Sequence, residues 1–434
     1  MWGAHWSILL EKRGIPGLFI VDQPFIEDVQ VTCEKDGMPV LRRVNVSHPC
    51  GLIPDSELPK IMKEIGNALT QPLTEEEKKA GTIRPKESSR IAVTGTLSEV
   101  QEYFSKQRWT DGLPIVPPTE ENVKEMLKGT KHPPDEIVAR KMLPENWIVT
   151  VEQVAINGVM AGCKPSHMPV LSAMVEAFAR DQFSSAVRST NSFSFMVTVN
   201  GPIRNEIGMN SGVNALGSGT RNNANAAIGR FLRLAIINLG GSDTTISDLS
   251  SQGNPSKFSF AFAENEERSP WEPFHVSMGY KRNESIVTIF TGGWGHVGND
   301  GSLAVVSRYI SQLELPWGVA VLIDPLRAHQ LAKEGYTKES IQEYLWKNAT
   351  MTAKQFREPE VFSIFIKPVL QGRIMYGMRD IWPRWYLDAP DDKVVQVYGK
   401  KEFIYVLVVG GETNPFITSW KMAFPSTVSV DKWR

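Results

Sequence analysis

The feature that most constrains the fold of this chain is a repeated pairing of a short strand-forming run with a glycine-rich or polar loop. The pairing occurs four times, at residues 195–199, 257–262, 285–290 and 403–409. In open α/β sheets, ligands bind beyond the carboxyl ends of the strands, where backbone donors and helix N-termini converge. A glycine that only ends a strand explains any single loop equally well. Together, the four runs predict an α/β fold with a mixed sheet, glycine-rich loops at the strand ends and a shared site there.

A charged, loop-like stretch at residues 71–95 interrupts this organisation and is interpreted as a linker. The residues before it, 1–70, predict a small N-terminal α/β module that is small enough to need a docking partner. Within this module, we expect a helix near residues 6–13, strands at 17–21 and 41–46, and an amphipathic helix over 57–69.

The residues after the linker, 96–434, predict a larger α/β region that holds the catalytic machinery. This region is long enough for two subdomains, at about 96–315 and 316–434.

The overall charge argues against two classes of partner. The chain has 434 residues, with 47 Lys and Arg against 48 Asp and Glu, so no net field favours nucleic acid or an anionic membrane surface. No apolar run reaches the roughly 18 to 20 residues that a membrane span requires, and residues 1–6 do not read as a signal peptide. Three cysteines are too few and odd in number for a secreted disulfide framework, so we expect a cytoplasmic protein.

Cys163 is the strongest single pointer to chemistry. It lies in the turn 161–165, beside Lys164 and ahead of a helical stretch that opens near Ser166. A thiol near a helix N-terminus and a lysine has the conditions that lower a cysteine pKa, which predicts a nucleophile or thiol relay. Free cysteines are also commonly packed as small hydrophobes, and that interpretation stays open.

The segment 208–225 combines glycine and asparagine and leads into a helix-like stretch. A glycine-rich loop at a helix N-terminus can bind an anion, and Arg221 could grip a carboxylate or phosphate. Nucleotide fingerprints are absent. The predicted substrate-binding residues are Gly217, Ser218, Gly219, Arg221 and Asn225, and the alternative is an asparagine-rich structural turn.

Two further clusters carry titratable groups. The loop 292–301 presents Trp294 as a substrate contact and His296 as a general acid or base. The segment 264–275 holds Glu266 as a candidate catalytic carboxylate, with Glu264, Glu267, Glu272 and His275 nearby. Its spacing matches no closed zinc pattern, so we expect no metal there and assign no cofactor. A solvated acidic turn and a partnerless surface histidine are the alternatives.

Residues 4–16 and 46–49 carry a family resemblance. They resemble the UGSC family, which is related to the selenoprotein B group of the glycine, sarcosine and betaine reductases. In those families a redox dyad lies just upstream of the first helix, and the expected Cys or selenocysteine-Gly-Ser-Cys is absent from this chain. The resemblance implies that the dyad was lost or lies on another portion or chain.

Residues 108–434 resemble the large, poorly characterised partner region that accompanies such modules, through residues 108–118, 157–165, 200–203 and 263–273. The leading hypothesis is an enzyme, or the large subunit of one, that handles a small polar or anionic substrate by thiol- or selenol-linked redox or carbon–heteroatom chemistry. We expect a thiol or selenoprotein partner and a homo- or hetero-oligomer. The alternatives are a cofactor-free lyase or hydrolase that uses Glu and His, and a non-catalytic scaffold that docks a redox partner.

Overall fold

The computed structural model describes residues 2–48, 50–79, 89–242, 247–298, 301–312, 317–374 and 381–434. The chain divides into two compact units. The N-terminal unit comprises Met1–Thr96 with Arg188–Thr190 and Ser242–Leu249, and the large unit comprises Leu97–Val187, Asn191–Gly241 and Ser250–Arg434. Part of the predicted linker and the predicted boundary near residue 315 lie outside the described residues. Among the described residues, no helix combines the length and apolar character needed to cross a membrane.

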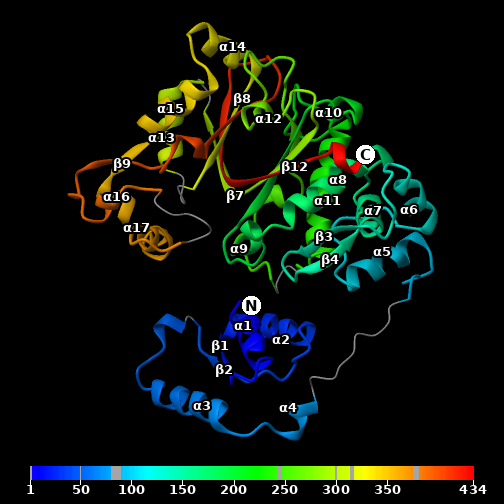
Figure 1. Ribbon diagram of the computed structural model, residues 1–434, viewed down its shortest axis with the longest axis vertical. Helices are drawn as coiled ribbons and strands as arrows, with labels where there is room; N and C mark the ends of the chain where they lie inside the picture. The colour runs from blue at the N-terminus through cyan, green and yellow to red at the C-terminus, as the bar shows by residue number, and fades with distance from the viewer. Residues whose placement is uncertain are drawn as a thin grey trace. The chain divides into compact units, whose positions relative to one another are not determined.

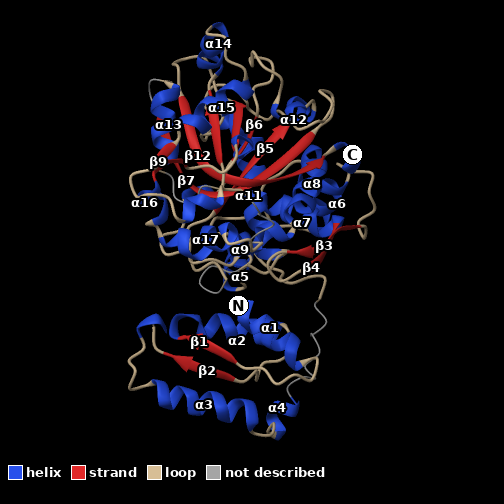
Figure 2. Ribbon diagram, turned by 60° about the vertical axis from the view of Figure 1, so that its left-hand side comes forward, coloured by secondary structure: helices blue, strands red, loops and turns tan. Residues whose placement is uncertain are grey.

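The N-terminal unit is a small α/β arrangement around two parallel strands, β1 (Phe19–Asp22) and β2 (Arg43–Val46). Its helices are α1 (Trp2–Glu11), α2 (Ile26–Lys35), α3 (Leu58–Thr70) and α4 (Glu75–Lys79). Figure 2 shows α1 and α2 on one side of the strands and α3 on the other. The core on the α1 and α2 side consists of Ala4, Ile8, Val21, Val29, Cys33 and Leu41.

The large unit is built on a six-stranded mixed sheet in the order β11-β8-β12-β7-β5-β6. Two neighbouring pairs, β8 with β11 and β5 with β6, are parallel, and the other pairs are antiparallel. The strands are β5 (Ser194–Asn200), β6 (Ala261–Ala263), β7 (Ile286–Gly298), β8 (Val319–Ile323), β11 (Ile404–Val408) and β12 (Ile417–Ser429). The predicted α/β class with a mixed sheet is therefore confirmed.

Two strands differ from the prediction. The sequence placed a loop from Gly292 onward, whereas β7 continues through the glycines to Gly298. At Gly292 a Cβ atom would lie 1.6 Å from the carbonyl oxygen of Lys421 in β12, so glycine permits the close approach of the two strands beside a register shift. Of the run 257–262, only the last two residues lie in the sheet, as the start of β6 (Ala261–Ala263), and the run begins within the 3-10 turn Pro255–Lys257.

The sheet curls until its two edge strands meet. Beyond the end of β6, the Asn265 N–H donates to the carbonyl oxygen of Val408 in β11 at 2.8 Å. Side chains from all six strands pack into one cluster on the inside of the curl. They include Met196, Phe262, Phe290, Leu322, Leu407 and Met422. The curl thereby brings the carboxyl ends of β5, β6 and β11 to one place.

Helices cover the outside of the curled sheet. Helices α13 and α15 pack over β8 and β11, α8 over β7 and β12, and α11 against β6. Figure 1 shows α13 and α15 on one side of β7 and β8, and α8 and α11 on the other. Two small antiparallel pairs, β3 (Ile137–Met142) with β4 (Trp147–Thr150) and β9 (Thr350–Thr352) with β10 (Val394–Gln396), are separate from the main sheet. The helices are α5 (Leu97–Lys106), α6 (Glu120–Leu127), α7 (Val151–Met160), α8 (Met168–Phe178), α9 (Ser184–Val187), α10 (Ile203–Glu206), α11 (Asn223–Asn238), α12 (Phe274–Ser277), α13 (Leu303–Ser311), α14 (Pro325–Lys333), α15 (Lys338–Asn348), α16 (Ala353–Arg357) and α17 (Lys367–Leu370).

Candidate functional site

The carboxyl ends of β1 and β2 carry an acid, an imidazole and a thiol. Asp22 is the last residue of β1, while His48 and Cys50 follow β2. Because the two strands are parallel, their carboxyl ends lie at one edge of the sheet. His48 Nδ1 lies 2.9 Å from Asp22 Oδ2, and the Cys50 N–H donates to the same oxygen at 3.3 Å. We call these three residues the Asp-His-Cys cluster.

The charge of Asp22 defines the state of the imidazole. Burial opposes ionisation of Asp22, but the hydrogen bonds from His48 and from the Cys50 backbone outweigh it, so its pKa lies below the ordinary 3.8. An ionised carboxylate accepts the Nδ1–H of His48, which leaves Nε2 as the basic nitrogen. The His48 side chain is 52% exposed and Cys50 is exposed. An imidazole that a carboxylate orients can activate a cysteine thiol within its reach, and Cys50 is held to the same carboxylate by its backbone N–H.

The other cysteine of this unit has the opposite surroundings. Cys33 lies in the core between α1 and α2 and has no solvent-exposed surface. Burial raises the pKa of its thiol from 9.0 to about 11. Within the N-terminal unit, therefore, Cys33 packs as a hydrophobe while Cys50 meets solvent.

Comparison with known proteins places this cluster in a named segment. Residues 2–75 match the UGSC family model. This UGSC segment contains both strands, the first three helices and the whole Asp-His-Cys cluster. The match does not extend into the large unit. No curated protein and no solved structure matches the chain.

In the large unit, Cys163 lies in the turn after α7. Helix α7 begins after a capping box formed by Thr150 and Gln153, and the chain leaves the helix through Gly162, whose φ of 81° only glycine adopts easily. The Cys163 N–H donates to the carbonyl oxygen of Gly158, so the thiol stands at the negative C-terminal end of α7. Helix α8 starts only at Met168, after a 3-10 turn.

These surroundings correct the expected acidity of Cys163. Burial raises the pKa of its thiol well above 9.0, and the charge of Arg230 offsets only part of this effect. Arg230 is itself held by Asp111 through two hydrogen bonds of 2.8 and 2.9 Å. Cys163 is half-buried and lines a hollow of about 280 Å³ with Val116, Asn122, Glu125, Met126, Val159, Gly162 and Pro165. The Cys163 thiol is therefore accessible to a small molecule in this hollow, and it is protonated at neutral pH.

Glu266 lies in a buried network at the joined strand ends. Its Oε1 accepts the Gly201 N–H at 2.7 Å and the Asn200 amide at 3.1 Å, and lies 3.2 Å from Arg204 Nε. His275 Nδ1 lies 3.9 Å from the same oxygen, and its side chain has no exposed surface. Within the described structure, Asn200 Oδ1, Arg204 Nε and His275 Nδ1 have no hydrogen-bond partner.

Glu264 is the centre of the same network. Its side chain has no exposed surface and accepts the Lys338 ammonium and the N–H groups of Phe274 and Val408, at 2.8, 2.6 and 3.3 Å. The Asn200 amide is a fourth donor, at 2.6 Å. These donors come from four separate segments, β5, α12, α15 and β11, which meet at the closure of the curled sheet. The arrangement stabilises this closure.

The asparagine-rich loop is largely held by its own side chains. Asn225 is buried, accepts the N–H of Asn210 at 2.9 Å and donates to the carbonyl oxygens of Asn210 and Ala215. Asn222 is buried in the same way and donates to Gly217. In contrast, Gly217, Ser218, Gly219 and Arg221 are exposed at the loop surface.

The structure brings some predicted residues together and separates others. The loop at 208–225 and the segment after Glu264 meet at Gly410, which donates to Ser211 and accepts from Asn265. The Cys163 hollow contains none of the other predicted residues. The backbones of Trp294 and His296 lie in β7, but their side chains lie outside the described part of the structure.

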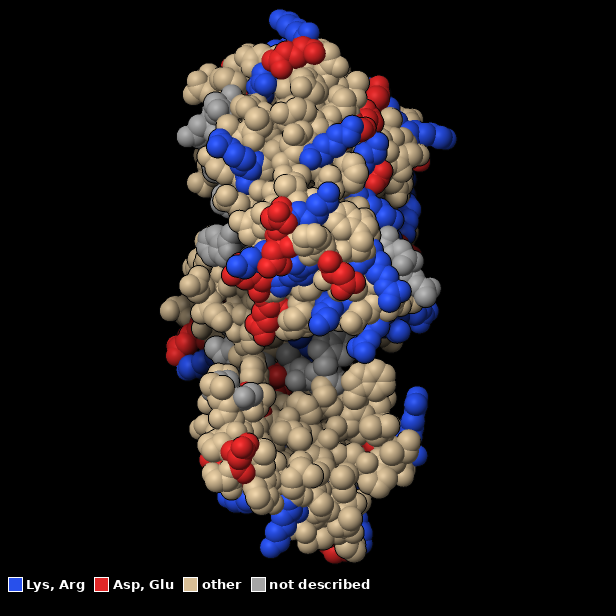
Figure 3. Space-filling model, turned by 90° about the vertical axis from the view of Figure 1, so that its left-hand side faces the viewer, with Lys and Arg blue, Asp and Glu red and all other residues tan. Residues whose placement is uncertain are grey.

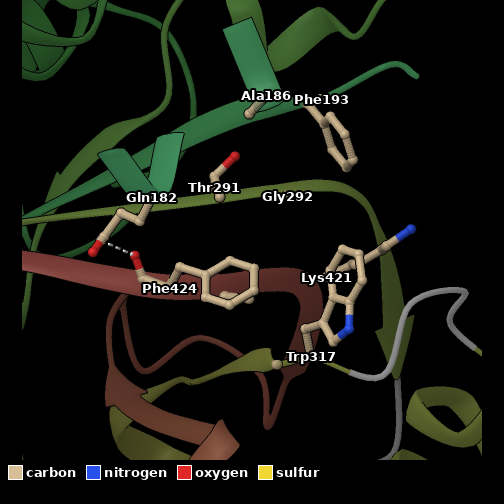
Figure 4. A pocket seen from close by; sticks show the side chains of 10 residues that line it. Gln182, Ala186, Phe193, Thr291, Gly292, Trp317, Lys421 and Phe424 are labelled. Carbon is tan, nitrogen blue, oxygen red and sulfur yellow. Dashed lines mark hydrogen bonds between the residues drawn. The ribbon is translucent and has the colours of Figure 1, made fainter. Parts of the chain in front are cut away.

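A cavity between β7 and β12 in the large unit is too small to hold a substrate. Figure 4 shows the rings of Phe193, Trp317 and Phe424 around it, with Gln182 donating to the Phe424 carbonyl at 2.7 Å. Its volume of about 30 Å³ admits a water molecule or two and no substrate. The described residues contain no group of three His, Cys, Asp or Glu side chains arranged to hold a metal ion.

Sequence reasoning missed the Asp-His-Cys cluster. It used His48 only for the family resemblance and Cys50 only for the cysteine count. The signal was nevertheless present, because a strand ending at Asp22 and a strand followed by His48 and Cys50 form the same strand-and-polar-loop pattern that marked the larger region.

Proposed function

We propose that the protein takes part in thiol–disulfide or thiol–selenol exchange with a redox partner, and that Cys50 is the reacting thiol. The observation that supports this proposal is the Asp22–His48 pair next to an exposed Cys50 at the carboxyl ends of two parallel strands. The resemblance of the UGSC segment to the reductase selenoprotein B group agrees with a thiol or selenol partner. Such chemistry suits a reducing cytoplasm.

The proposed step balances without an added oxidant. His48 Nε2 accepts the proton of the Cys50 thiol, and the thiolate attacks one sulfur of the partner's disulfide or selenenylsulfide bond. The Cys50–sulfur bond forms as the sulfur–sulfur or sulfur–selenium bond breaks, and the departing thiolate or selenolate takes the proton from His48. Asp22 stabilises the imidazolium between the two transfers. A second thiol of the partner, as its thiolate, then attacks the partner's sulfur in the mixed disulfide, so that a disulfide forms within the partner and Cys50 leaves as a thiolate that takes up a proton.

The test measures release of thionitrobenzoate from dithiobis(nitrobenzoate) by the full chain at about pH 7. We expect Cys50→Ser to remove the fast phase and Cys163→Ser to keep it. We expect His48→Gln to slow that phase by roughly a hundredfold, because general-base assistance contributes about this much. A fast phase that survives in Cys50→Ser contradicts the proposal.

A second candidate function belongs to the large unit, which would bind a small polar or anionic substrate beside Cys163. Its supporting observation is the hollow of about 280 Å³ that the half-buried thiol lines. We expect a methyl-sized thiosulfonate to label Cys163 in the folded protein and a bulky aromatic one to fail. Equal labelling by both reagents, or by neither, contradicts a small pocket.

Acid–base chemistry at Glu266 has weaker support. Its side chain is only 7% exposed, and its neighbour His275 is fully buried. We therefore propose no lyase or hydrolase step there. Oligomer formation stays a proposal tied to the redox partner.

A further inference from the structure

The two-stranded sheet of the N-terminal unit leaves the outer edges of both β1 and β2 unpaired among the described residues. In the described part of the chain, β1 pairs only with β2. Parallel sheets normally contain more strands and have both faces covered, because their connections place helices on both sides. The open edge of β1 is thus a position at which a further strand can add.

One apolar side chain of β1, that of Ile20, is exposed in this strand. In the parallel register Ile20 pairs with Val44, so both side chains point to the α3 side of the sheet. Helix α3 contacts β2, and Val44 is 3% exposed, whereas Ile20 is 48% exposed. On α3 itself, Met62 is 64% exposed. Figure 3 shows few charged side chains on the face that this unit, the lower part of the view, turns toward the viewer.

The handedness of parallel connections selects the same position. Helix α2 lies on one face of the sheet and α3 on the other (Figure 2). The connection from β1 to β2 runs through α2 on one face, and α3 leaves β2 on the other face. Because the face changes, a right-handed connection through α3 runs back toward β1, and a parallel strand that follows it would lie on the outer side of β1. A strand leading right-handedly into α1, on the α2 face, would occupy the same edge.

That position is next to the proposed chemistry. A strand that adds parallel to β1 ends beside Asp22, at the edge of the sheet that carries His48 and Cys50. We propose that the redox partner docks by adding a parallel strand to the open edge of β1 and presents, directly after that strand, the sulfur atom that Cys50 attacks. This inference rests on the proposed function and names the partner's chemistry: an extended segment of alternating apolar residues followed by a loop that carries a reactive disulfide or selenenylsulfide.

The test uses a synthetic probe with the full chain. The probe is a peptide of alternating valine and threonine, followed by glycine and a cysteine that carries thionitrobenzoate as a mixed disulfide. We expect release from this peptide to be at least about tenfold faster than release from the same disulfide on free cysteine, because docking raises the effective concentration. A peptide with the cysteine at its amino end should react more slowly, because only the parallel orientation places the sulfur beside Cys50.

Two N-methylated peptides make the test specific for strand addition. One carries N-methyl groups at odd positions and the other at even positions, so each blocks the donors of one strand edge. We expect one of them to lose the rate advantage and the other to keep it. Rates that are equal for all peptides overturn the docking proposal.

Matched variants separate the docking proposal from the proposed function. Ile20→Lys should reduce the advantage of the peptide several-fold, whereas Ile15→Lys, at a position that is similarly exposed in the loop after α1, should not. In Cys50→Ser, release should stop while the peptide still binds, as measured by fluorescence anisotropy. Release that continues in Cys50→Ser overturns the exchange function, and loss of binding in Ile15→Lys but not in Ile20→Lys overturns the docking site.

Sedimentation of the chain alone tests whether a second copy occupies the edge. Dimers that form in the wild type and disappear in Ile20→Lys would identify a second copy as the occupant and would contradict a partner strand.

Discussion

Both units place polar groups at the carboxyl ends of strands, but these groups are exposed in the N-terminal unit and buried in the large unit. In the N-terminal unit, Asp22 holds an imidazole that is half exposed, and Cys50 reaches solvent. In the large unit, Glu264 at the end of β6 has no exposed surface and four donors within the protein. The two strand ends therefore differ in exposure: the polar groups of the N-terminal unit reach solvent, and those around Glu264 do not.

The thiols follow the same division. Cys50 is exposed and its backbone N–H shares the Asp22 carboxylate with the His48 imidazole, while Cys163 stands at the C-terminal end of α7 in surroundings that raise its pKa. A position close to a lysine in the sequence does not by itself acidify a thiol. Desolvation and the direction of the nearest helix decide the pKa.

The largest expected effect tests whether Glu264 is structural. Glu264→Gln leaves the buried Lys338 ammonium without its counter-charge, so we expect the free energy of unfolding in urea to fall by about 3–5 kcal/mol. The double variant Glu264→Gln with Lys338→Met should recover part of this loss. A loss below about 1 kcal/mol for the single variant would contradict the structural role of Glu264, because the strand ends of the large unit would then contribute little to stability.

The second prediction examines how dry the surroundings of Cys163 are. His167, four residues further on, is 1% exposed, and burial together with the charge of Lys164 lowers its pKa from 6.5 to about 4. Between these values the unfolded chain binds a proton that the folded chain does not, so stability falls as the pH drops from 6.5 to 4. The expected loss is about 3 kcal/mol.

The measurement for His167 compares urea unfolding of the wild type and of His167→Asn at about pH 7 and pH 4. The variant lacks this titration, so the wild type should lose the larger amount of stability. Equal losses in the two proteins mean that water reaches this imidazole in the folded state, and the contrast between the two thiols weakens.

The third prediction concerns the asparagine-rich loop. Asn225→Ala removes three hydrogen bonds to buried backbone groups and should lower the free energy of unfolding by about 2 kcal/mol. Arg221→Ala, at an exposed position of the same loop, should change it by less than about 0.5 kcal/mol. Chemical denaturation of both variants checks this pair, and a larger loss for Arg221→Ala would reverse the roles given to the two side chains.

Much of the fold was predictable because it follows local rules. Strand-forming runs, the amphipathic pattern of α3 and the capping box at Thr150 appear where their residue types place them. The continuation of β7 through Gly292 was not predictable, because only contact with β12 explains a glycine inside a strand. Closure of the sheet between Asn265 and Val408 joins residues more than a hundred positions apart, and no local pattern specifies such a pairing.

The candidate site was less predictable than the fold. Glycine-rich loops and Cys163 drew attention because they are unusual in composition, but neither burial nor the direction of the nearest helix can be read from composition. The Asp-His-Cys cluster depends on the parallel pairing of β1 with β2, which brings Asp22 to residues 26 and 28 positions further along the chain.

The most direct test of the account is the rate at which iodoacetamide alkylates each cysteine of the folded chain at about pH 7, followed by mass spectrometry of the peptides. The account predicts that Cys50 reacts first, Cys163 much later and Cys33 only after unfolding, and that His48→Gln slows Cys50 alone. Faster alkylation of Cys163 than of Cys50 would contradict it, because the reactive thiol would then lie in the large unit.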